Sequence, residues 1–74
     1  MNNKIRKSLG RIVDTLNGVK SELEDIKDNE QGSFDNLPEG LQSAEMGEKF
    51  EENVSELEDI ISELEDIADR IGEI

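Results

Sequence analysis

Apolar residues recur with heptad spacing over most of this chain, and this spacing limits what the chain can fold into. From Ile5 to Ile26, the steps between successive apolar residues of one series alternate between four and three. Among regular structures, a helix brings such a series onto one face. The same spacing returns at Phe50 and continues to Ile74. We therefore predict an all-α fold with two long helices.

Residues 31–42 interrupt the heptads and contain Pro38, the only proline, which prevents one continuous helix. Gly32 suits the exit of the first helix, and Ser43 suits the N-cap of the second. The expected elements of a single domain, residues 1–74, are a helix at about 3–30, a loop at 31–42 with a short helical turn at 38–41, and a helix at about 43–72. Similar helix lengths and a short loop predict an antiparallel, coiled-coil-like helical hairpin.

The second helix has a broader apolar face than the first. In heptad lettering a to g, both helices carry mostly Leu or Phe at a and mostly Ile or Val at d. Val13 is the only apolar e residue of the first helix, whereas Val54, Ile61 and Ala68 occupy e in the second. A broad face serves a helix with two neighbours, so we predict a homodimer that forms a four-helix bundle, or a higher helical oligomer. The expected self-association residues are Val54, Leu57, Ile61, Leu64, Ala68 and Ile71.

The size and composition of the chain also favour self-association. A core built from 74 residues is small, and the absence of Cys and His excludes disulfides and leaves no zinc ligands of those types. The longest apolar run, Ile60-Ile61, is far shorter than a membrane span. We expect a soluble, cytoplasmic protein that does not contact the membrane.

Charge is distributed unevenly along the chain, whose net charge is −12. Residues 1–20 hold five cations and one acid, a net +4, and residues 21–74 carry −16. In an antiparallel hairpin, residues 21–56 form the loop end with twelve acids and two lysines, a net −10. An acidic surface repels phosphates, so we expect no direct nucleic-acid binding and instead a protein partner with a basic surface.

The residue types argue against catalysis. Without His, Cys, Tyr or Trp, most general bases and nucleophiles are missing, so we predict a non-enzymatic protein without cofactor or metal. The spacing of Glu45/Glu48 and Glu63/Asp66 matches the carboxylate motif of MazG-type pyrophosphatases, but every SELEDI heptad produces it on a solvated face. A calcium loop from Asp28 to Glu39 would lack the glycine that an EF-hand requires.

The cations near the N-terminus have two interpretations. Lys4, Arg6, Lys7 and Arg11 pair with acids of the second helix, or they form a site for a small anionic ligand. No aromatic residues lie among them to stack on nucleic-acid bases.

The loop segment GSFDNLPEGL, residues 32–41, also has two interpretations. Phe34, Leu37 and Leu41 close the open end of the helix pair, while Asp35 or Asn36 bonds to backbone amides ahead of Pro38. Alternatively, Phe34 is an exposed anchor that acids surround, which suits a basic protein. The candidate interaction residues are Phe34, Asp35, Asn36, Leu37, Glu39, Glu45 and Glu48.

The sequence FDNLPEGLQSAEMGEKFEENVSELEDIISELEDI, which starts at Phe34, resembles small acidic proteins of unknown function from phages and mobile elements of Gram-positive bacteria. The resemblance covers about residues 34–74 and centres on the FDNLPEGLQ motif. It implies a phage or prophage origin, and hence a bacterial host cell, but little about mechanism. For a protein of that origin, we expect modulation of a host process, including counter-defence, by binding another protein. The alternatives are a DNA-mimic inhibitor, a protein that sequesters an anionic ligand, and a structural or assembly protein.

Overall fold

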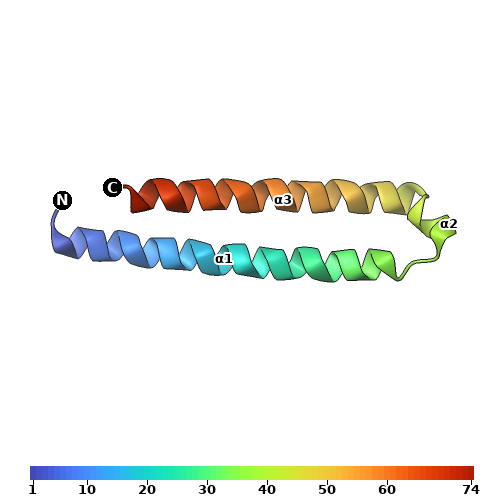
Figure 1. Ribbon diagram of the computed structural model, residues 1–74, viewed down its shortest axis with the longest axis horizontal. Coiled ribbons are helices and arrows are strands. Elements are labelled where there is room, and N and C mark those ends of the chain that lie inside the picture. The colour runs from blue at the N-terminus through green and yellow to red at the C-terminus, as the bar shows by residue number, and fades with distance from the viewer.

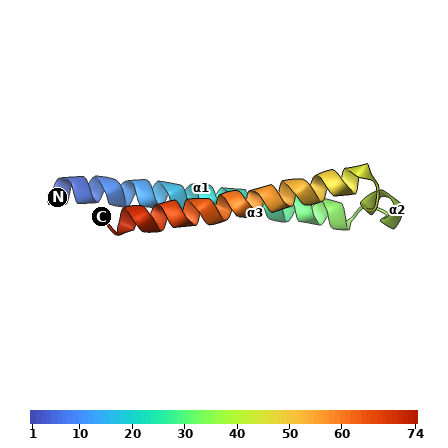
Figure 2. The same cartoon turned by 90° about the horizontal axis from the view of Figure 1, so that it is seen from above.

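The computed structural model describes residues 1–74, and its regular elements are helices only, so the predicted all-α class is confirmed. The helices are α1 (Asn3–Asp35), α2 (Glu39–Gln42) and α3 (Glu45–Gly72). Figure 1 shows α1 and α3 lying side by side in opposite directions, with α2 between them at one end. The N- and C-termini lie at the other end, as the perpendicular view in Figure 2 also shows. We refer to these as the loop end and the terminal end.

The helix boundaries differ from the predicted ones at the loop end. The side chain of Asn2 caps α1 by accepting a hydrogen bond from the backbone amide of Ile5 at 2.9 Å. The helix then runs through Gly32, whose φ is not positive, and ends at Asp35 rather than at about Glu30. The exit expected at Gly32 is therefore wrong. A glycine permits a left-handed exit but does not require one.

The N-cap expected for the second helix is also wrong. Ala44 is the cap residue of α3, with φ −84° and ψ 177°, and no side chain bonds to that helix end. The Ser43 hydroxyl instead donates to the carbonyl of Glu39 or of Gly40, each at 3.4 Å. Because Ser43 ends α2, its side chain bonds backward to that short helix and not forward to α3.

The a and e positions of α1 and α3 form the contact between the two helices. Ile61 and Ala68, at 9% and 5% exposure, are the only buried apolar side chains. Half-buried apolar residues of this contact are Leu9, Val13, Leu16, Leu23 and Phe34 on α1, and Phe50, Val54, Leu57, Leu64 and Ile71 on α3. The expected self-association residues therefore lie within the chain's own helix contact rather than on an outer face.

Two lysines explain how α1 covers the apolar e positions of α3 although its own e positions are mostly polar. Lys20 and Lys27 occupy e in α1 and are half-buried. Lysine places its aliphatic stem along apolar surface while its ammonium group reaches water. With these stems in place, α1 covers the broad face of α3 without apolar residues at each e position.

The apolar d positions of both helices are left largely exposed. Ile5, Ile12, Val19 and Ile26 on α1, and Ile67 and Ile74 on α3, are between 40% and 57% exposed. The molecule measures 59 × 15 × 11 Å and has a radius of gyration of 17.2 Å. A compact domain of this length has a radius of about 11 Å. None of the helices combines the length and the apolar character that crossing a membrane requires.

Candidate functional site

The side chain of Gln42 ties the loop end together. Its amide nitrogen Nε2 lies within hydrogen-bond distance of three backbone carbonyls, those of Phe34 (3.2 Å), Asp35 (3.5 Å) and Leu37 (3.0 Å). The last carbonyls of a helix have no partner within it, so Gln42 satisfies the exposed end of α1 from α2. The side chains of Asp35 and Asn36, which we had expected to bond to backbone amides ahead of Pro38, are not the groups that satisfy these carbonyls.

Gly47 lets α3 pass close to this junction. It is the one buried glycine, and a Cβ at this position would overlap the carbonyl oxygen of Gln42 and lie 3.3 Å from Phe34 Cε2. Glycine is therefore required here for the close approach of α3 to α2 and α1. The heptads place Gly47 at e, but this position alone does not specify the close approach.

Phe34 and Phe50 join the two long helices at the loop end. Their ring centroids are 4.4 Å apart and their planes differ by 3°, so the rings stack. Both side chains are half-buried, so Phe34 is neither a fully buried cover nor a free anchor. The interpretation that three apolar side chains close this end is wrong for Leu41, which is 46% exposed.

A groove of about 370 Å³ opens beside the stacked rings. Phe34 and Leu37 line it from the α1 side, and Met46 and Phe50 line it from α3. Met46 is 61% exposed, so its flexible side chain is available to a partner. The remaining lining residues are Glu30, Ser33, Lys49 and Asn53.

An acidic groove adjoins this apolar one. Met46 and Lys49 line both, and the second groove adds Glu45, Glu48 and Glu52 of α3. All three glutamates are exposed, and Glu45 and Glu48 lie in the first turn of α3, where the helix dipole favours carboxylates. The loop end therefore places an apolar recess directly beside carboxylates.

The other candidate interaction residues lie outside the two grooves. Asp35 Oδ1 accepts a hydrogen bond from Gln31 Nε2 at 3.1 Å, and Asn36 is the C-cap residue of α1. Glu39 is exposed in α2. The groove thus combines Phe34 and Leu37 with Met46 and Phe50, which we had not proposed as interaction residues. The d position of Met46 in the heptads was the signal that could have identified it.

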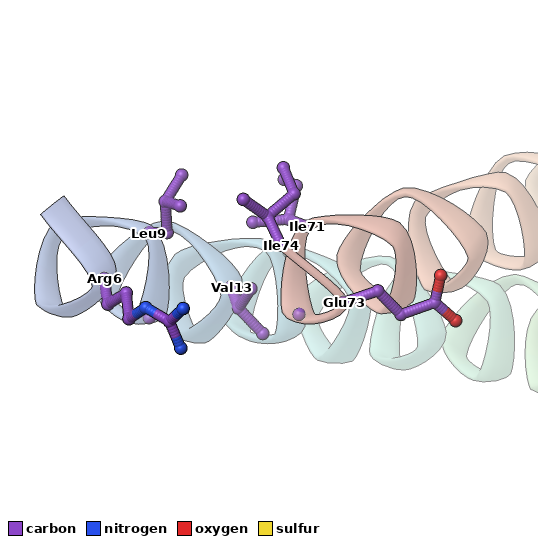
Figure 3. A pocket seen from close by; sticks show the side chains of 8 residues that line it. Arg6, Leu9, Val13, Ile71, Glu73 and Ile74 are labelled. Atoms are coloured by element: carbon purple, nitrogen blue, oxygen red, sulfur yellow. The ribbon is translucent and has the colours of Figure 1, made fainter. Parts of the chain in front are cut away.

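The structure divides the basic strip between two surfaces. Lys4, Lys7 and Arg11 line an open groove on α1 with Gly10 and Asp14. Arg6 instead lines a groove of about 300 Å³ between α1 and the end of α3. In Figure 3, Arg6 and Glu73 do not point toward each other across this groove.

The spaced carboxylates do not gather into one site. Glu45 and Glu63 lie on the same helix at positions eighteen residues apart, which corresponds to about 27 Å along α3. The structure contains no group of three or more Asp and Glu side chains that could hold a metal ion.

Comparisons with protein-family models, with curated proteins and with solved structures found no match. The function must therefore be argued from the geometry of the chain itself.

Proposed function

We propose that this chain is a non-catalytic protein-interaction module. In this proposal, the helical hairpin dimerises into a four-helix bundle, and its loop end binds a protein partner with a basic surface. The observation that carries the proposal is the apolar groove beside the Phe34–Phe50 stack, which shares Met46 with an acidic groove.

The two adjoining grooves suit a partner that presents an apolar side chain beside cations. The apolar side chain would enter between Met46 and the phenylalanines, and Lys or Arg would lie over Glu45, Glu48 and Glu52. Interfaces of this kind combine a desolvated anchor with surrounding charges that raise the association rate. The net charge of −10 on residues 21–56 would attract such a partner.

The biological role that we propose is modulation of a host process by a phage or prophage protein. The resemblance of residues 34–74 to small acidic phage proteins supports this role, and six of the eight residues that line the groove lie in the part of the chain that carries the resemblance. Binding a host protein requires no catalytic group.

A capped peptide with one leucine flanked by arginines, titrated into the ¹⁵N-labelled protein, tests the binding site. We expect chemical-shift changes at Ser33, Met46 and Phe50, and weaker binding when alanine replaces the leucine. Met46→Lys should abolish these changes. Leu41→Lys is the matched control, because it adds the same charge at an exposed apolar residue of the loop end outside the groove.

Two results would contradict the proposal. Shift changes spread evenly over the acidic surface would indicate charge attraction without a site. Binding that survives Met46→Lys but is lost when Glu45, Glu48 and Glu52 become glutamine would favour a DNA mimic, because only the carboxylates would then matter.

A further inference from the structure

We infer that a second copy of this chain covers the exposed d positions, with the two loop ends pointing in opposite directions. This inference rests on the dimer proposed above and adds its surface, register and orientation. We call this surface the d face. It consists of the exposed Ile5, Ile12, Val19 and Ile26 of α1 and Ile67 and Ile74 of α3, together with the half-buried Ile60.

The d positions of the two helices lie on one side of the molecule. Because α1 and α3 are antiparallel and turn their a and e positions toward each other, the neighbouring d positions of both helices fall on the same side. In Figure 3, Ile74 at a d position points to the same side of the helix pair as Leu9 and Ile71 at a positions. The opposite side carries the polar b positions, among them Glu24, Glu51, Glu58 and Glu65.

The exposed area of the chain matches what a dimer buries. A folded monomer of this mass exposes about 4,600 Å², whereas this chain exposes 5,685 Å². The excess of roughly 1,100 Å² exceeds the roughly 800 Å² that each partner contributes to a standard interface.

The spacing of the d face gives the register. The four α1 residues are symmetric about a point between Thr15 and Leu16, and the three α3 residues are symmetric about Ile67. Both points lie at about the same height. The groove that Arg6 lines at the terminal end shows that residues 6–13 of α1 lie beside residues 71–74 of α3. Each of these segments lies about six residues along its helix from the centre of symmetry, so the two centres are at the same height. A two-fold axis at this height pairs Ile5 with Ile26, Ile12 with Val19, Ile60 with Ile74, and Ile67 with its own equivalent.

Charges beside the d face favour loop ends at opposite ends of the dimer. Glu63 and Arg70 occupy g positions on either side of Ile67, four residues before it and three residues after it. The two-fold axis at Ile67 therefore places each Glu63 beside Arg70 of the second copy. The alternative dimer, with both loop ends together, places Glu63 near Glu22 of the second copy. It also brings two ends of net charge −10 together, which is unfavourable at short range.

The polar d positions fit the same arrangement. In this register, the partner's N-terminus reaches about residue 30 of α1, and its C-terminus reaches about residue 60 of α3. Beyond these points the d positions are Ser33, Asn53 and the flexible Met46. The apolar groove beside the Phe34–Phe50 stack therefore stays open, and the dimer presents two such grooves about 60 Å apart.

Single cysteines test this register cleanly, because the chain has no cysteine of its own. Sedimentation equilibrium first establishes the stoichiometry. Ile67→Cys should then form a disulfide-linked dimer on oxidation, since the two copies meet at the axis. Ile26→Cys is the matched control and should not, because Ile26 is similarly exposed and its two copies lie about 31 Å apart along the bundle.

A charge exchange provides a second test that does not disturb the d face. Arg70→Glu or Glu63→Arg should each weaken the dimer by about tenfold, because two like-charge pairs replace two opposite ones. The double variant should restore the dissociation constant to within about threefold of the original.

The outcomes separate the two proposals. A chain that sediments as a monomer overturns both the dimer and this inference. A dimer in which Ile67→Cys does not crosslink, or in which the double variant shows no recovery, overturns the register and orientation while leaving the dimer intact.

Discussion

Phe34 near the end of α1 and Phe50 near the start of α3 stack with their ring centroids 4.4 Å apart, although sixteen residues separate them in the sequence. Their pairing fixes the relative height of the two long helices at the loop end. It also forms one wall of the candidate groove, so the stability of this end and its proposed binding role depend on the same side chains.

Replacing Phe50 by alanine should lower the free energy of unfolding by about 1–3 kcal/mol, because it removes the stack and leaves Phe34 without its aromatic partner. Urea unfolding followed by circular dichroism at 222 nm measures the change. Leu41→Ala is the control, since Leu41 is 46% exposed and should lose less than about 0.5 kcal/mol. Equal losses for both variants would show that the stack adds nothing to stability.

Gly47→Ala should destabilise the protein although alanine is the better helix former. Its Cβ would overlap the Gln42 carbonyl, so α2 or α3 must move. At Gly18, where a Cβ meets nothing within 4 Å, the same change should stabilise α1 by about 0.5–1 kcal/mol. Thermal unfolding of the two variants should therefore shift in opposite directions. A rise in melting temperature for both would contradict the close packing at Gly47.

Gln42→Ala should make local opening of the backbone more frequent at the loop end while leaving the terminal end unchanged. The carbonyls of Phe34 and Leu37 would lose their side-chain donor, at a cost of about 1 kcal/mol. Amide hydrogen exchange should become faster in residues 32–37 and in α2, with no change around Leu64. Gln31→Ala removes only an exposed bond to Asp35 and serves as the control. Uniformly faster exchange along both long helices would instead indicate global destabilisation.

The stability of the fold against urea should rise with the concentration of salt. Residues 21–56 carry a net charge of −10 at one end of the molecule, and screening weakens their mutual repulsion. The urea midpoint should therefore be higher in 300 mM than in 20 mM sodium chloride. In a variant with Glu45, Glu48 and Glu52 changed to glutamine, the salt dependence should be smaller. A midpoint that does not respond to salt would contradict this charge distribution.

The candidate site could be predicted only in part. Phe34 and Leu37 were expected at the loop end because they are the apolar residues of an otherwise polar interruption. Met46, Gln42 and Gly47 were missed, since each owes its role to a neighbour from another element: Met46 to the groove beside Phe34, Gln42 to the end of α1, and Gly47 to the passage of α3. The heptads place Met46 at d and Gly47 at e, but they do not specify the neighbours from other elements that give these residues their roles.

The heptads by themselves determined that the chain is all-α, because a spacing of three and four residues forms a continuous face only on a helix. They did not determine which part of that face is buried. Positions d, a and e span about 100° of the helix surface. A modest rotation of each helix about its own axis therefore decides whether d and a or a and e face the other helix. The tertiary structure decided this: the helices turn a and e inward, the stems of Lys20 and Lys27 complete the contact, and the isoleucines at d, except the half-buried Ile60, remain largely exposed on one face.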